Sequence, residues 1–384
     1  MTDTTFSAYR SELLGRDEPP PCSTDGAALE ESARRIMAPG PFGYVAGGAG
    51  SGATVRANRE AFDRHRIVPR MLRGAHKREL GVRLFGVPLP APVVLAPIGV
   101  QTLVHPDGEL AVARAAASVG LPMTVSTTAS YPLEQVAAAA AGPRWFQLYW
   151  PDDDEVCLSL LDRARRSGYA TLVVTADNWA FGWRTTDLDL GYAPAADGLG
   201  SANALADPVF RRRLARPPEQ DRPAAVARWA AMFTGTDRDW DQLAWLRRQW
   251  AGTLLLKGVL HADDARQAVA AGVDGVVVSN HGGRQVDGAV AALDALPAVA
   301  AAVGDRATVL FDSGIRTGAD MVKALCLGAD AVCVGRPYLY GLAHGGEPGV
   351  RHVLRSLLAD LDLTMALSGV RAIDELRPGL LRPR

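Results

Sequence analysis

The stretch SNHGGRQ at residues 279–285 sets a histidine, two glycines and an arginine directly after the apolar run GVVV at 275–278. Histidine is the usual general base near neutral pH, because its ordinary pKa is about 6.5. A neighbouring guanidinium suits an anionic substrate, since arginine binds carboxylates through two parallel hydrogen bonds. The spacing therefore indicates that His281 removes a proton from a substrate whose negative charge is held by Arg284.

Charged residues close two further apolar runs. Asp177 ends TLVVTAD at 171–177, and Arg184 follows it in NWAFGWR. Asp177 is a candidate to orient His281 and stabilise its imidazolium, and Arg184 is a candidate second ligand for a carboxylate. Lys257 comes directly after the run LLL at 254–256. A lysine in that position either forms a Schiff base or sets a positive charge beside a developing anion.

Glycine and arginine occur together after two later runs, in DSGIR at 312–316 and in GRP at 335–337. Glycine lets backbone N–H groups approach a phosphate closely, and arginine supplies the charge. In β/α barrels the loops after strands seven and eight commonly bind phosphate, so this pattern predicts a phosphate-bearing cofactor. The small residues at 96–99, with Gln147 and Tyr149, are suited to flank a flat ring.

Eight short apolar runs must position these residues, at 93–97, 123–127, 144–150, 171–177, 253–259, 275–280, 308–314 and 331–337. Helical patterns lie between most of them, as at 108–119, 152–167, 262–271 and 318–327. Eightfold strand–helix alternation predicts a (β/α)8 TIM barrel, with an N-terminal helical extension around 27–37. A doubly wound nucleotide fold is the rival, but its glycine fingerprints are absent, and GGAGSG at 47–52 follows no strand.

Residues 178–252, between the fourth and fifth runs, are longer than one crossover helix requires. They include the helical patterns RWAAMF at 228–233 and WDQLAWLRRQW at 240–250. An excursion after a barrel strand lies over the active site, so we expect a lid inserted over 185–252. The alternative is a surface insertion without a role, because loops tolerate length. Before the barrel, Pro19-Pro20-Pro21 predicts a loosely ordered arm over 1–30, which leaves 31–384 as a single domain.

Composition excludes several classes of protein. The chain has 384 residues, 48% of them hydrophobic, and 41 Lys and Arg against 42 Asp and Glu give a net charge of -1. This balance argues against a disordered chain and against a nucleic-acid or anionic-membrane partner. The four cysteines are scattered, which predicts neither a disulfide framework nor a metal site. With no signal-peptide pattern and no long apolar run, we expect a cytoplasmic protein.

Together, SNHGGRQ, the upstream KGV and the downstream DSGIR and GRP resemble the FMN-dependent α-hydroxy-acid oxidising family, over about residues 36–367. The resemblance implies FMN bound in the barrel and oxidation of an L-2-hydroxy acid. It assigns proton abstraction to His281 with Asp177, and substrate binding to Tyr44, Tyr149, Arg184 and Arg284. It assigns flavin contacts to Pro97, Ile98, Gly99, Ser126, Gln147, Thr175, Lys257, Ser279, Asp312, Gly314, Arg316, Gly335 and Arg336.

Within the family, DLDLGY, DPVFRRRLAR and the Trp-rich helix of the insertion are most similar to lactate 2-monooxygenase. The resemblance therefore implies a lactate-like substrate, oxygen as acceptor, oxidative decarboxylation, and a tetramer or octamer. The alternative is an oxidase that releases keto acid and peroxide. Its substrate could be a larger acid, because Thr128 stands where many glycolate-type oxidases have Trp. Two further departures are Gly99, where Ala is frequent, and Ser313, where Gly is common.

A flavin-dependent isomerase or an IMP-dehydrogenase-like enzyme on the same barrel fits less well. Such enzymes either lack the His/Arg pair of NHGGR or carry a catalytic cysteine in a mobile loop, and none of the four cysteines here lies at such a strand end. A non-catalytic barrel would not need His281 together with both arginines and both tyrosines.

Overall fold

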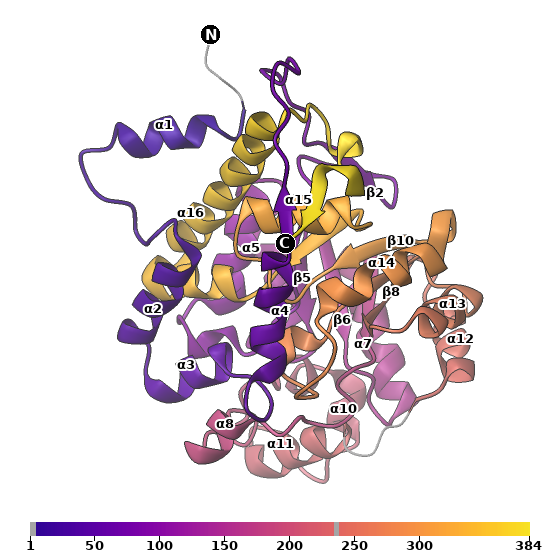
Figure 1. The fold of residues 1–384 in the computed structure, drawn as a ribbon. Coiled ribbons are helices and arrows are strands. Elements are labelled where there is room, and N and C mark those ends of the chain that lie inside the picture. Colours follow the sequence, from indigo (N-terminus) through magenta and orange to yellow (C-terminus); the bar gives the residue numbers. More distant parts are fainter. Residues whose placement is uncertain (1–4, 234–237) are drawn as a thin grey trace.

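Eight parallel strands close into a barrel in the computed structural model, which describes residues 5–233 and 238–384 (Figure 1). The strands, in barrel order, are β4 (Val93–Leu95), β5 (Met123–Ser126), β6 (Arg144–Leu148), β7 (Thr171–Thr175), β8 (Thr253–Val259), β9 (Gly275–Val278), β10 (Thr308–Phe311) and β11 (Ala331–Val334). Each falls within one of the eight apolar runs, so the predicted TIM barrel is confirmed. Because all strands point the same way, their carboxyl ends meet at one rim.

The barrel interior is a packed core. Val94, Trp145 and Leu255 belong to the side chains that fill it. At the amino-terminal end of the barrel, the hairpin of β2 (Val82–Leu84) and β3 (Val87–Leu89) packs against the same cluster. Phe85 of this hairpin contacts Trp145 edge-on, with ring centroids 5.9 Å apart. The amino-terminal end of the barrel is therefore closed, and the carboxyl rim is the end where a ligand can bind.

The outer layer consists of helices whose apolar faces cover the strands. They are α5 (Gly108–Ser118), α6 (Leu133–Ala139), α7 (Asp154–Arg166), α12 (Trp240–Gln249), α13 (Ala262–Ala270), α14 (Ala292–Val303), α15 (Gly318–Cys326) and the long α16 (Arg336–Ser368). The helices predicted at 108–119, 152–167, 262–271 and 318–327 are confirmed, with ends that differ by at most two residues. Among the described residues, no helix is both long and apolar enough to span a bilayer.

The excursion after β7 contains α8 (Thr185–Asp189), α9 (Ala202–Leu205), α10 (Pro208–Arg212) and α11 (Arg222–Ala231). Three of these, α8, α10 and α11, gather below the barrel in Figure 1. The predicted insertion of 185–252 is too long at its C-terminal end, because α12 lies in the barrel wall beside α13. Arg247 of α12 forms a 2.8 Å ion pair with Asp274, and Trp245 stacks on Trp150. The extra chain therefore ends before α12, which is the crossover helix.

The N-terminal arm is more ordered than its three consecutive prolines suggest. The described part of 1–30 contains α1 (Ala8–Leu14) and the start of α2 (Gly26–Ile36), and both contact α16. Tyr9 is buried, and its hydroxyl lies 2.7 Å from Nδ1 of the buried His352. Residues 1–4 lie outside the described residues. The expectation of a loosely ordered arm is therefore corrected for α1, because a side chain from it is anchored in a polar contact.

Two helices connect this extension to the barrel rim. They are α3 (Pro39–Ala46) and α4 (Ala53–Asp63), and the loop between them lies near the lid helices in Figure 1. Residues 44–47, at the end of α3, enter the site described next.

Candidate active site

A cavity of about 700 Å³ opens at the carboxyl rim of the barrel. Its lining includes all but five of the predicted site residues: Tyr44, Pro97, Ile98, Gly99, Tyr149, Arg184, Lys257, His281, Arg284, Asp312, Gly314, Arg316, Gly335 and Arg336. The lid contributes much of the remaining wall, from Asn178 to Phe233. The structure thus brings together residues from six strand-end loops, the end of α3 and the lid.

His281 and Asp177 form the pair that the sequence predicts. Nδ1 of His281 lies 2.8 Å from Oδ1 of Asp177, which leaves Nε2 as the nitrogen available for a proton. Burial lowers the pKa of His281 below its ordinary value, although Asp177 acts in the opposite direction. Burial alone would raise the pKa of Asp177, but the charges of His281 and Lys257 outweigh it and the pKa is lowered. The pair is therefore a neutral imidazole beside a carboxylate near neutral pH, as a general base requires.

The backbone at His281 is held in an unusual conformation. Its φ is +57°, in the left-handed region that favours glycine. The N–H of His281 donates to Ser279 Oγ at 3.0 Å, and the N–H groups of Asn280 and Gly282 donate to Ser313 Oγ. Ser313 itself has φ +78°, which explains why glycine is common at that position. Its hydroxyl bonds hold the histidine loop in place and offset the strained backbone.

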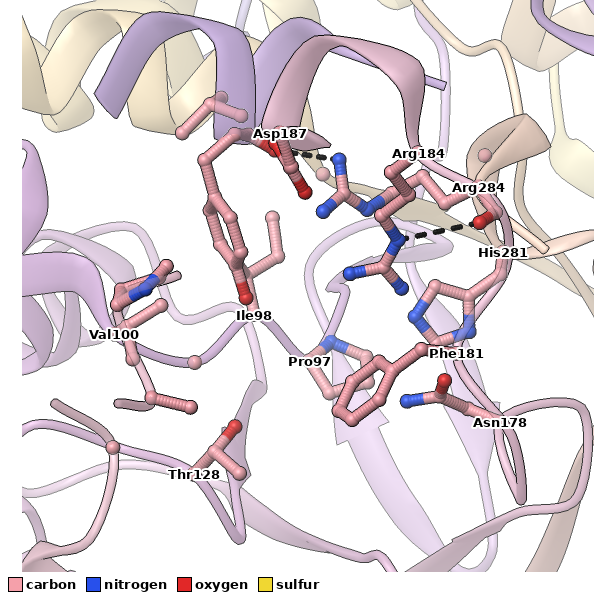
Figure 2. A pocket seen from close by; sticks show the side chains of 18 of the residues that line it. Pro97, Ile98, Val100, Thr128, Asn178, Phe181, Arg184, Asp187, His281 and Arg284 are labelled. Carbon is pink, nitrogen blue, oxygen red and sulfur yellow. Dashed lines mark hydrogen bonds between the residues drawn. The ribbon is translucent and has the colours of Figure 1, made fainter. Parts of the chain in front are cut away.

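Arg184 and Arg284 lie side by side next to the His281–Asp177 pair (Figure 2). Nε of Arg184 donates to the carbonyl oxygen of Arg284 at 3.3 Å. Arg284 donates to the carbonyl oxygens of Tyr44 at 2.5 Å and Gly47 at 3.0 Å. Burial and the charge of Arg184 lower the pKa of Arg284 to about 10. Two guanidinium groups this close repel each other, and an anion between them removes that repulsion. This geometry suits a carboxylate.

Gln285 is a site residue that the sequence analysis does not single out, although it ends the motif SNHGGRQ. Its amide nitrogen donates to the carbonyl oxygens of Asp177 at 2.7 Å and Ala180 at 2.8 Å. Its amide oxygen accepts from Arg184 Nη2 at 3.0 Å and from the N–H of Gly182 at 3.4 Å. One side chain thus fixes the loop that carries both Asp177 and Arg184 against the loop that carries His281.

Lys257 lies on the cavity floor. Its Nζ is 3.2 Å from Asp312 Oδ2 and 2.8 Å from Ser279 Oγ. Burial alone would lower the pKa of Lys257, but Asp312 and Asp177 outweigh it and raise the pKa above its ordinary value. Lys257 therefore stays protonated. A protonated amine is no Schiff-base nucleophile, so of the two roles that the sequence leaves open, the structure favours charge stabilisation.

Arg316 and Arg336 form a second cationic corner beside Gly314 and Gly335. Arg336 donates to the carbonyl oxygens of Val45, Gly282 and Gly47 at 2.8–3.0 Å. Burial and the charge of Arg336 lower the pKa of Arg316. Both side chains are partly buried, and two such neighbouring cations are stabilised by a phosphate. The donor set, with Lys257 and the small loop at 97–99 along the floor, therefore fits FMN. When bound, FMN supplies two-electron chemistry.

Five predicted residues lie behind the lining rather than along it. Asp177 lies behind His281 and bonds to its Nδ1. The other four are buried strand-end groups that bond among themselves or to Lys257: Ser126, Gln147, Thr175 and Ser279. Ser126 Oγ donates to Gln147 Oε1 at 2.9 Å, and Gln147 Nε2 donates to Thr175 Oγ1 at 3.0 Å. The structure places this network under the cavity floor, where it fixes the strand ends.

The fold and the site are those of a barrel whose cationic corner suits a phosphate-bearing cofactor, and whose His–Asp pair and two arginines suit an anionic substrate. Comparison with known proteins identifies the class. The family described as FMN-dependent dehydrogenase matches residues 33–383. The chain belongs to this family and is an FMN-dependent α-hydroxy-acid oxidoreductase.

Several relatives match along nearly the whole chain. An FMN-dependent alpha-hydroxy acid dehydrogenase, qulF, of Penicillium citrinum is 45% identical, covering 100% of this chain and 97% of that protein. An L-lactate oxidase of Lysinibacillus sphaericus is 40% identical, covering 98% and 97%. Among solved structures, a mandelate oxidase has 38% identity and a TM-score of 0.83, covering 94% of this chain and 98% of that one.

Proposed function

We propose that this enzyme oxidises an L-2-hydroxy acid such as L-lactate with oxygen and decarboxylates the product before releasing it. The overall reaction is lactate plus O2 to acetate, CO2 and water. Lactate loses two electrons when it is oxidised to pyruvate and two more when peroxide decarboxylates the pyruvate, and oxygen accepts all four. The observation that carries the proposal is the lid, because it forms a wall of the cavity that holds His281 and both arginines.

The substrate-binding steps follow from the chain's own residues. Arg184 and Arg284 hold the substrate carboxylate. The hydroxyls of Tyr44 and Tyr149 line the same cavity and are available to bind the remaining polar groups of the substrate. His281 takes a proton from the substrate, and Asp177 stabilises the imidazolium that forms. Lys257 offsets negative charge at the cofactor side of the cavity. Holding the acid at two cations orients its α-carbon before the proton leaves.

After the substrate is oxidised, retention of the keto acid and peroxide in the cavity decides which products are released. Keto acid and peroxide that stay together in a closed cavity react with each other, releasing CO2, whereas an open cavity releases both. The lid residues Val226, Trp229 and Phe233 line the cavity, and the rings of Trp229 and Phe233 meet edge-on at 4.5 Å. This packed wall supports retention. Gly99 adds less room than its size suggests, because a Cβ there would come within 2.1 Å of Thr128 Oγ1.

The second candidate is an oxidase that releases keto acid and hydrogen peroxide. It is favoured by relatives named L-lactate oxidase and 4-hydroxymandelate oxidase, the latter from Amycolatopsis orientalis and 40% identical over 91% of this chain. The two candidates share every step up to oxidation of the substrate and differ only in what leaves the cavity.

Product analysis under air separates them. We expect purified holoenzyme with L-lactate to give acetate and CO2 in step with the oxygen consumed. Catalase is included as a control, because it destroys free peroxide and prevents decarboxylation in solution. Equal amounts of pyruvate and peroxide, measured without catalase, would establish the oxidase reaction instead.

A further inference from the structure

The cavity has two chemically different ends. Figure 2 shows Arg184, Arg284 and His281 on one side of the pocket, and Val100 and Thr128 on the other. The charged end binds the carboxylate and holds the base. The opposite end is lined by apolar groups of the barrel rim and the lid, with the Thr128 hydroxyl among them.

The apolar end is built by close contact between the lid and the barrel rim. A Cβ added to Gly200 of the lid would come within 2.8 Å of Cγ1 of Val100 and of the Thr128 carbonyl oxygen. A Cβ on Gly198 would meet Val226 of α11 at the same distance. Both glycines have positive φ, so the lid backbone is shaped to approach the rim there. The contacts join Thr128, Gly200 and α11 into one continuous wall.

The wall is also closely packed. Val226 and Trp229 are buried, and Trp229 packs edge-on against Phe210 and Phe233 with centroids 5.7 and 4.5 Å apart. The Thr128 hydroxyl is engaged, because it lies 3.1 Å from Ser126 Oγ. A polar side chain entering this end would lose its water without gaining charged partners, whereas an apolar one would gain burial.

We infer that this apolar end binds the side chain of the 2-hydroxy acid, and that the preferred substrates carry a branched or aromatic apolar side chain larger than the methyl group of lactate. The inference rests on the proposed function, since it requires the carboxylate to be held by Arg184 and Arg284. Lactate fits the charged end and leaves the apolar end without a ligand group.

Anaerobic reduction of the bound flavin tests the inference. Holoenzyme is mixed with L-lactate or with L-2-hydroxy-4-methylpentanoate, and the reduction rate constant divided by Kd is measured for each. Added methylene groups in an apolar pocket are each worth roughly 10-fold or more, so we expect a ratio of at least about 10 in favour of the branched acid. A ratio of one or below would overturn the inference. Failure of both acids to reduce the flavin would instead overturn the proposed function.

A matched pair of variants tests where the side chain of the substrate binds. Ala230 of α11 lines the cavity, and its neighbour Ala231 is exposed and outside the lining. Ala230→Phe narrows the apolar end, so we expect the ratio to fall by about 10-fold or more. Ala231→Phe adds the same bulk to the same helix outside the cavity, and we expect the wild-type ratio. If Ala230→Phe folds and retains the wild-type ratio, the side chain binds elsewhere.

If Ala230→Phe does not fold, Thr128→Phe narrows the same end from the barrel side. It is scored by the same ratio, with loss of the preference expected and an unchanged preference counting against the inference.

Discussion

Gln285 shows how a residue away from the reacting atoms sets the geometry of a site. It bridges the loop of Asp177 and Arg184 to the loop of His281 through four hydrogen bonds. Gln285→Leu removes all four, each worth about 0.5–1.5 kcal/mol. We expect slower flavin reduction, by roughly 10-fold or more, together with a higher Kd for the acid, because the base and the carboxylate ligand lose their fixed positions.

Rapid-mixing kinetics on Gln285→Leu measure both constants. Gln267→Leu, the same change on the exposed face of α13, is the control and should behave as wild type. A Gln285→Leu enzyme that differs only in melting temperature would reduce Gln285 to a stability role.

The pH dependence follows from the His281–Asp177 pair. His281 must be neutral to accept a proton, and its pKa lies below the ordinary value because of burial. We expect flavin reduction to be independent of pH around neutrality and to decline as the pH falls through the lowered pKa. Asp177→Asn removes a charge that raises this pKa, so the acid limb should move to still lower pH. Without the carboxylate the imidazolium is unsupported, so the plateau rate should drop by about 10²- to 10⁴-fold.

The test is a pH series of anaerobic reduction rates for wild type and Asp177→Asn. An acid limb that moved to higher pH in the variant would contradict the assigned coupling of the two groups.

At the scale of elements, we expect the packing of the lid to affect which products leave the cavity. Trp229 of α11 is buried between Phe210 and Phe233, and truncating a buried Trp typically costs about 3–5 kcal/mol of packing. We expect Trp229→Ala to loosen the cavity wall and to raise the share of turnovers that end in free peroxide. A coupled peroxidase assay measures that share.

Trp183→Ala is the control for this prediction, because Trp183 lies in the same excursion but is 72% exposed. If both variants leaked peroxide equally, retention would not depend on the buried wall.

The elements themselves were predictable to different degrees. Buried parallel strands have continuous apolar runs such as TLVVT, so all eight strands and the residues at their carboxyl ends could be located from sequence. The role of α12 could not, because an amphipathic helix looks alike whether it covers a barrel or a lid. Nor could the buried position of Gln147 and Ser126, since a polar residue at a strand end gives no sign of its depth.

The roles of single residues could be predicted from sequence only where the residue type is chemically distinctive. His281 and Arg284 are chemically distinctive, whereas Gln285 is a common neutral residue whose importance lies wholly in contacts made across the fold. Ser313 could be noted as a departure, but only its φ of +78° and its hydroxyl bonds explain how a side chain is accommodated there.

At the scale of the whole molecule, cofactor binding and stability are linked. Arg316 and Arg336 repel each other in the absence of an anion, so phosphate binding should stabilise the folded state. At 100 times Kd a ligand adds about 2.7 kcal/mol, and we expect FMN to raise the melting temperature of the flavin-free protein by several degrees. Riboflavin, which has the ring but no phosphate, should raise it much less. Equal shifts for the two would mean that the arginine corner does not bind the phosphate.

The carbonyl groups at the end of α3 have a consequence for how the protein is made. Tyr44, Val45 and Gly47 accept hydrogen bonds from Arg284 and Arg336, so the first fifty residues complete a site whose last part is near position 336. At about 5–20 residues per second, a ribosome reaches Arg336 roughly 15–60 s after Tyr44. The early segment must wait, exposed or chaperoned, until nearly the entire polypeptide has emerged. We therefore expect flavin to load late in biogenesis, and we expect a nascent chain halted before Arg336 to carry no cofactor.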